Sequence, residues 1–401
     1  MTRTQTHAQA DDYPTALGRA QRLATVAGLV GLVLAVILVP MSGGLEAFFQ
    51  GYLIAYIFWI GLTLGCLALL MLQHLAGGPW GAIARRFLEA GAGNVFMMAL
   101  LFIPVLIGMR SLYVWTDAEY IAAHHIVELK TSYLNIPAFI LRSAIYFATW
   151  GILVFLFRRW SQRQDDGEDL AQHMRNAGAL GVLLFVVTMT FAAFDWGMSL
   201  TPEWFSGMYG VIFMIGQLIS AVCLLILLLV NFRQVEPLRQ VLNDKRLQDF
   251  GNFLMAFTMF WAYVQTSQMI ILWSNNVVET NTWYVTRFGV GWGWVGGFLL
   301  VFHFFAPFLI LFSRWVKQKG RALVWVAVWL LLMRVVDIYW IVVPSFEREG
   351  FAFRPLDLAL LLAFGGIWLS FFFRRLKTTP ILPNHDPRIE PELTGAAAAH
   401  D

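Results

Sequence analysis

The sequence predicts an all-α integral membrane protein with about ten transmembrane helices, and three observations lead to this prediction. Hydrophobic residues make up 59% of the 401 residues and charged residues only 13%, whereas a soluble domain carries about 25% charged residues. The apolar residues form long runs, and about 20 of them cross a bilayer core of roughly 30 Å. Arg and Lys gather in every second connection between these runs. This pattern argues against a large soluble enzyme.

Ten runs meet the length requirement for a transmembrane helix. They cover residues 21–40, 48–72, 92–113, 135–157, 176–196, 207–231, 249–273, 290–313, 321–343 and 356–374. The last run is the weakest candidate, because Asp357 lies near its start. Residues 1–18 contain no apolar stretch before a small-residue cleavage site, so we expect no cleavable signal peptide.

The distribution of positive charge predicts that both ends of the chain lie in the cytoplasm. Of the 28 Lys and Arg, 21 fall in or beside the connections that are cytoplasmic in this orientation and only 5 in the opposite ones. We therefore expect a cytoplasmic segment over 1–20, a membrane domain over 21–374 and a cytoplasmic tail over 375–401. Its prolines and alanine run predict that this tail is disordered.

An internal repeat divides the membrane domain into two units of four helices. Tyr52 and Cys66 in one run correspond to Tyr209 and Cys223 in another, both at an offset of 157 residues (209 − 52, 223 − 66). Similar matches align 93–94 with 251–252, 156–160 with 311–315, and 195–196 with 337–340. An even number of helices preserves direction, so the two units are predicted to be parallel repeats. We expect two four-helix bundles, at about 48–196 and 207–343, flanked by the first and last helices.

Several segments resemble a known family of membrane subunits. The segment DWGMSLTPEWFS at 195–206 is similar to one found in the NrfD or polysulfide-reductase type subunits of bacterial alternative complex III. Further similar stretches lie at 69–75, 130–135, 261–263, 303–308 and 332–337. The resemblance covers roughly 20–375, and ten spans in about 400 residues fit the ActF-type subunit better than its longer paralogue.

What the resemblance implies is a core subunit of a quinol:electron-acceptor oxidoreductase in a respiratory or photosynthetic electron-transport chain. The location that it implies is the cytoplasmic (inner) membrane of a bacterium. Its implied partners are a paralogous NrfD-like membrane subunit and periplasmic subunits that carry iron–sulfur clusters and several c-type haems. Nothing indicates a nucleic-acid partner. From the residues themselves we expect no metal or haem in this chain, because Cys66 and Cys223 stand alone and no two histidines lie mid-span. A quinone or quinol is a possible ligand of this chain.

A few ionisable residues fall inside the predicted spans, where a charge costs at least about 2.5–3.5 kcal/mol. Arg334 and Asp337 are three residues apart on one helix face and can pair. Arg142 and Asp195 lie near the outer ends of two adjacent spans and can form a corresponding pair. Each pair has two interpretations: a proton path or quinone pocket, or a structural feature, namely a packing ion pair at 334–337 and a solvated helix-end carboxylate at 195.

His303 lies near the middle of its span, and the preceding span is unusually polar, with Tyr263 and Gln268 among its members. These three residues complete the candidate set for a proton path or quinone pocket, and a packed hydrogen-bond network remains the alternative. His124 and His125 lie in the long outer connection and are candidates for docking a partner.

The sequence therefore predicts a membrane core subunit that serves quinol oxidation without being catalytic alone, since it shows no redox centre of its own. Quinol oxidation needs an apolar slot for the ring and a group that accepts protons, and this chain can supply both. Two alternatives remain open. One is a purely structural membrane anchor, and the other is a secondary transporter built from repeats.

Overall fold

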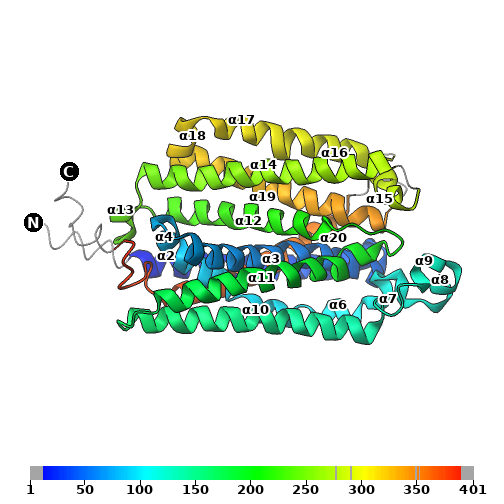
Figure 1. Ribbon diagram of the computed structural model, residues 1–401, viewed down its shortest axis with the longest axis horizontal. Helices are drawn as coiled ribbons and strands as arrows, with labels where there is room; N and C mark the ends of the chain where they lie inside the picture. The colour runs from blue at the N-terminus through cyan, green and yellow to red at the C-terminus, as the bar shows by residue number, and fades with distance from the viewer. Residues whose placement is uncertain (1–11, 276–277, 290, 348–349, 352, 390–401) are drawn as a thin grey trace, which may run out of the picture.

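The computed structural model describes residues 12–275, 278–289, 291–347, 350–351 and 353–389, and every element within these ranges is a helix. The long helices run side by side along one axis (Figure 1). The start of the first described helix and the end of the last lie together, because Lys377 Nζ donates to Gln21 Oε1 at 2.7 Å. We call this end of the bundle the tail end, and the opposite end, which carries α8 and α9, the loop end.

Nine helical segments in the described part of the chain are long and apolar enough to cross a membrane, which confirms the predicted fold class. By helix they are α2 (Asp12–Leu38), α3 (Gly44–Ala76), the broken span Pro79–Ile107, α10 (Ile136–Asp165), α11 (Ala171–Trp196), α12 (Tyr209–Asn231), α16 to α17 (Trp292–Phe312), α19 (Gly320–Val342) and α20 (Pro355–Leu376).

The remaining predicted span, 249–273, corresponds to α14 (Asp244–Asn275). This helix is long enough to cross a membrane but more polar than the other nine. Four polar residues in a row, at 265–268, lower its hydropathy. It nevertheless packs lengthwise against α12 and the α16–α17 segment, in line with the other spans (Figure 1). The protein is therefore an all-α membrane protein with about ten spans.

The third span differs most from its predicted boundaries. We expected residues 92–113, but the helical segment begins at Pro79 and is divided into α4 (Pro79–Ala92), α5 (Val95–Leu100) and α6 (Ile103–Ile107). Arg85 and Arg86 fall in the predicted connection between the spans 48–72 and 92–113. In the structure they are instead buried and paired with Glu89, which is the physical reason for the difference. With these charges neutralised inside the protein, the span extends past them to Pro79.

The helices form two groups that meet through the first helix of each predicted repeat. In the first group α3 packs against α4 and α11, and α10 packs against α11. In the second group α12 packs against α14 and α19, and the α16–α17 segment completes it. Helices α3 and α12 contact each other, which joins the two bundles. The flanking helices α2 and α20 pack along each other, and α20 also lies against α3 and α4.

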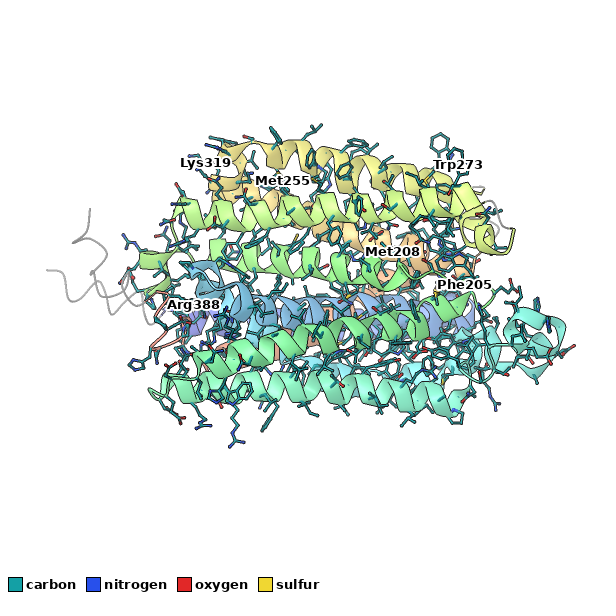
Figure 2. The ribbon with its side chains drawn as sticks, in the orientation of Figure 1. Phe205, Met208, Met255, Trp273, Lys319 and Arg388 are labelled. Carbon is teal, nitrogen blue, oxygen red and sulfur yellow. The ribbon has the colours of Figure 1, made fainter. Side chains whose placement is uncertain are left out.

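Short helices cover the loop end. In the first bundle α7 (Met109–Leu112), α8 (Ala118–Ala123) and α9 (His125–Glu128) form a protrusion beyond the long helices (Figure 1). In the second bundle α15 (Val278–Phe288) lies across the same end (Figure 1). The described lysine and arginine residues at the tail end include Lys319 and Arg388, whereas Phe205 and Trp273 lie toward the loop end (Figure 2).

The tail differs from the predicted disorder in its described part. Residues 377–389 fold back over the tail end, and Ile381, Leu382 and Ile389 are buried there. The reason is that this segment carries both apolar side chains and an ion pair between Asp386 and Arg388. Residues 390–401, and residues 1–11 of the predicted N-terminal segment, lie outside the described residues.

A close contact between α2 and α20 yields a prediction for stability. A Cβ atom on Gly366 of α20 would lie 2.1 Å from the backbone nitrogen of Gly28 of α2. We expect Gly366→Ala to lower the free energy of unfolding by about 1–3 kcal/mol, because the backbones must separate. Thermal unfolding in detergent, followed by tryptophan fluorescence, measures it. Gly297→Ala is the matched control, because nothing lies within 4 Å of its added Cβ; a Gly366→Ala protein as stable as this control would contradict the prediction.

Candidate functional site

The second bundle contains a buried ion pair on α19. Arg334 Nη1 donates to Asp337 Oδ2, and the two side chains are 2% and 0% exposed. The indole nitrogen of Trp261, on α14, donates to the same carboxylate oxygen at 3.2 Å. The other oxygen, Oδ1, has no hydrogen-bond partner among the described residues. The pair that the sequence predicted is therefore formed, with one carboxylate oxygen left over.

The ion pair fits in the bundle because α12 has a glycine opposite it. A Cβ atom on Gly216 would lie 2.1 Å from Arg334 Cζ. The guanidinium therefore occupies space that a side chain on α12 would otherwise take. Any larger residue at this position would push Arg334 away from Asp337.

His303 lies next to this pair on an irregular turn. The segment Leu300–Phe305 between α16 (Trp292–Leu299) and α17 (Ala306–Phe312) is a π-helical turn, a feature frequent at functional sites. The carbonyl of Phe302 in this turn accepts a hydrogen bond from Trp329 Nε1 at 2.7 Å. The imidazole of His303 is fully buried and lies edge-on to the Trp261 ring, with ring centroids 4.3 Å apart. Neither of its nitrogens has a partner within the described part of the chain.

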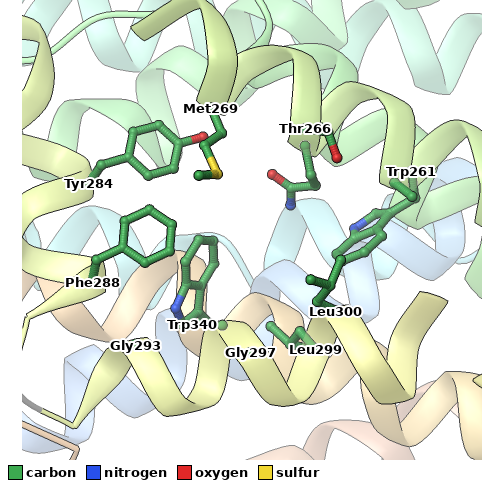
Figure 3. A pocket seen from close by; sticks show the side chains of 13 residues that line it. Trp261, Thr266, Met269, Tyr284, Phe288, Gly293, Gly297, Leu299, Leu300 and Trp340 are labelled. Carbon is green, nitrogen blue, oxygen red and sulfur yellow. The ribbon is translucent and has the colours of Figure 1, made fainter. Parts of the chain in front are cut away.

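A cavity of about 300 Å³ adjoins Trp261 and lies between α14, α15 and α16. In Figure 3, Tyr284 and Phe288 close one side, Trp261 lies on the opposite side, and Trp340 forms part of the floor. Gln265 and Thr266 supply polar groups to a lining that is otherwise aromatic and aliphatic. A mostly apolar cavity with a few polar groups is typical of a small-molecule site.

The first bundle contains the other predicted pair. Arg142 of α10 holds Asp195 of α11 through two hydrogen bonds, of 2.9 Å from Nε and 2.8 Å from Nη2. The hydroxyl of Tyr146 donates to the same carboxylate at 2.7 Å. Asp195 is completely buried, so it is not the solvated helix-end carboxylate of the alternative interpretation. The Arg142 guanidinium also stacks on the ring of Tyr133 at 3.8 Å.

Two predicted site residues on α14 lie elsewhere. Tyr263 is 65% exposed and is absent from the residues that line the cavity. Gln268 is buried, but it accepts a hydrogen bond from Ser206 Oγ at 2.7 Å, near the loop end, instead of contacting Arg334 or Asp337. Gln265 and Thr266 of the same polar stretch do line the cavity. The polarity of this helix indicated a site, but the helical phase of each residue could not be assigned from the sequence.

The two outer histidines belong to the protrusion at the loop end. His124 Nδ1 lies 2.9 Å from the carbonyl of Tyr120, and its Nε2 lies 3.4 Å from Glu203 Oε1. The side chain of His125 is 79% exposed. Neither contacts the two buried ion pairs in the interactions described, and their docking role stays a prediction.

Arg287, like Arg85 and Arg86, is a buried charge that the sequence analysis missed. Arg287 of α15 was expected at the outer edge, but it is 1% exposed. It donates to the carbonyl of Trp283 at 3.1 Å and to the carbonyl of Ile341, and it stacks on the Trp283 ring. Burial lowers the pKa of Arg287 to about 9. The available signal in the sequence was Trp283, which precedes Arg287 by four residues and therefore lies on the same face of a helix.

No metal centre emerges from the described residues, in which no group of three or more His, Cys, Asp or Glu side chains could hold a metal ion. Comparison with protein-family models and with curated proteins finds no match for this chain.

The ion pair of the first bundle, Arg142–Asp195, yields a prediction for stability. We expect Arg142→Met to lower the free energy of unfolding by about 3 kcal/mol, because it leaves the buried Asp195 without its cation. The double variant Arg142→Met/Asp195→Leu is expected to recover most of this loss, since no charge is left unpaired. Thermal unfolding in detergent measures both. Arg163→Met breaks an exposed pair and is the control, with little expected change. A double variant less stable than the single variant would contradict the prediction.

Proposed function

We propose that this protein is a membrane core subunit of a bacterial quinol:electron-acceptor oxidoreductase of the alternative complex III type, in the position of the ActF-type subunit. The resemblance of segment 195–206 to the NrfD-like subunits supports this assignment. The helical membrane architecture is compatible with it. The electron acceptors would belong to partner subunits, and the termini would lie in the cytoplasm, as the distribution of Arg and Lys predicts.

Within that complex, we assign a proton-carrying role to the second bundle. The observation that carries this assignment is the set of unpaired atoms around Arg334 and Asp337: one oxygen of Asp337 and both nitrogens of His303 lack partners among the described residues. A buried polar atom without a partner costs about 1–3 kcal/mol. Atoms that accept and release protons cannot be permanently engaged in hydrogen bonds within the protein. A proton-carrying role would therefore explain why the fold tolerates this free-energy cost.

The geometry also specifies what must complete the path. Trp261 lies between His303 and Asp337, but an indole nitrogen only donates and cannot pass a proton on. A proton that moves between His303 and Asp337 therefore needs a water molecule or a hydroxyl group to bridge them. The cavity beside Trp261 is large enough to hold water, but neither His303 nor Asp337 lines it, so the bridge would have to extend from the cavity past Trp261.

A double variant distinguishes the proton-carrying role from that of a purely structural anchor. We expect Arg334→Met/Asp337→Leu to assemble and fold, because replacing both partners of a buried ion pair by apolar residues is often neutral for stability. We expect it to lose proton translocation while quinol oxidation continues. The measurement is proton uptake or release per electron by the assembled complex in liposomes.

Two controls make this experiment decisive. The variant Arg142→Met/Asp195→Leu removes the other buried pair and should keep translocation, if the path runs through the second bundle alone. Co-purification in mild detergent establishes whether cytochrome c and iron–sulfur subunits accompany the chain. Unchanged translocation in the Arg334/Asp337 variant would favour the anchor, and a chain that purifies without redox partners would overturn the assignment to the complex.

The cavity supports a second candidate role, namely binding the ring of a quinol in this chain. Its aromatic walls and the polar groups of Gln265 and Thr266 match the needs of a quinol ring with two hydroxyl groups. Gly297 lines the cavity, and nothing lies within 4 Å of a Cβ atom placed on it.

This role predicts the effect of filling the cavity. We expect Gly297→Phe to raise the KM for quinol in the assembled complex, because the new ring occupies the space of the ligand. Gly297→Ala, which leaves most of the cavity open, serves as the control. Steady-state oxidation measured over a range of quinol concentrations distinguishes them. An unchanged KM in a folded Gly297→Phe complex would place the quinol elsewhere.

A further inference from the structure

A second cavity, of about 210 Å³, lies at the tail end and takes no part in the proposed function. Five segments of the chain build it: the end of α3, the middle of α4, the end of α10, the start of α11 and the folded-back tail. Its polar lining consists of His74, Arg85, Gln164, Gln172, Arg175, Asp386 and Arg388.

The charged groups at this cavity leave an excess of positive charge. Arg85 is paired with Glu89, and it also contacts Asp386 at 3.5 Å. Asp386 is held mainly by Arg388, at 2.7 Å. Of the charged side chains that line the cavity, three are arginines (Arg85, Arg175 and Arg388) and one is a carboxylate, Asp386. The excess arginine is Arg175, which lines the cavity, is exposed, and makes no ion pair within the described part of the chain.

Asp386 does not cancel this excess, because its charge is already engaged. Burial alone would raise the pKa of Asp386, but hydrogen bonds from Arg388 and the charges of Arg388 and Arg85 hold that pKa below its usual range. The carboxylate accepts hydrogen bonds from Arg388 Nε at 2.8 Å and Nη2 at 2.7 Å. The Asp386 carboxylate is therefore held in place in the lining of the cavity by Arg388.

One further feature of the cavity favours an anion. The Nε2 atom of His74 is buried without a hydrogen-bond partner among the described residues. The N-terminus of α11 is already occupied, because Asp169 Oδ1 accepts a hydrogen bond from the backbone nitrogen of Ala171 at 3.2 Å.

The folded-back tail closes this site. Arg388 Nη1 donates to Gln73 Oε1 at 2.7 Å, and the backbone nitrogen of Asn384 donates to Asp165 Oδ1 at 2.9 Å. These contacts tie the tail to α3 and α10 on both sides of the cavity. A bound anion would therefore contact the tail and the helix ends together.

We propose that this cavity binds a phosphate group, with Arg175, Arg85 and His74 as its ligands. Guanidinium groups are common protein ligands of phosphate. The group could belong to an anionic lipid, because basic pockets between helices at a membrane surface bind lipid head groups. It could equally belong to a soluble phosphate compound that enters from the tail side.

The test uses the purified full-length chain and measures the midpoint of thermal unfolding. Inorganic phosphate and glycerol 3-phosphate are titrated in a non-ionic detergent, with chloride at matched ionic strength as the baseline. In parallel, the chain is placed in phosphatidylcholine nanodiscs with and without phosphatidylglycerol. We expect one of these probes to raise the midpoint, and Arg175→Gln to weaken the apparent affinity roughly tenfold, because a charge-assisted hydrogen bond is lost.

Arg159→Gln is the matched control, because Arg159 is an exposed arginine near the same end of α10 and does not line the cavity. Stabilisation by the soluble compounds that depends on Arg175 but not on Arg159 supports the proposal with a soluble ligand. The same dependence for phosphatidylglycerol alone supports it with a lipid. The proposal is overturned if no probe stabilises the chain, or if both variants lose the effect equally, which would indicate attraction by the charged surface as a whole.

Discussion

Hydrocarbon cannot solvate a charge, and this constraint determines how the interior of the protein is built. The two arginines deep in the spans, Arg142 and Arg334, each pair with a carboxylate of the same chain, Asp195 and Asp337. The backbone follows the same requirement. Helix α12 has a glycine where the Arg334 guanidinium passes. The third span extends to Pro79 because Glu89 neutralises Arg85 and Arg86 inside the fold.

The two bundles meet this constraint in different ways, although the sequence predicts that they arose as repeats. In both, the carboxylate belongs to the last helix of the bundle, α11 or α19. In the first bundle the arginine comes from the neighbouring helix α10, so the ion pair links two helices. In the second the arginine precedes the carboxylate by three residues on the same helix, and only Trp261 links the carboxylate to another helix.

The sequence was sufficient to predict the helices and both ion pairs, because these depend on local composition and on the cost of charge in a membrane. Spacing by three residues placed Arg334 beside Asp337, and a shared depth placed Arg142 beside Asp195. It was not sufficient to predict which face of α14 turns inward, so Tyr263 was chosen although Gln265 and Thr266 line the cavity. The burial of Arg287 and the packing of the tail depend on contacts between distant segments, which no local pattern reveals.

The degree to which each carboxylate is satisfied distinguishes the two pairs. Asp195 accepts three hydrogen bonds, and both of its oxygens are engaged by Arg142 and Tyr146. Its environment is that of a structural link between helices. Asp337 keeps one oxygen without a partner, next to a histidine whose two nitrogens also lack partners among the described residues. A folded chain would satisfy such atoms if packing were their only purpose, and this difference is the physical reason for placing proton chemistry in the second bundle.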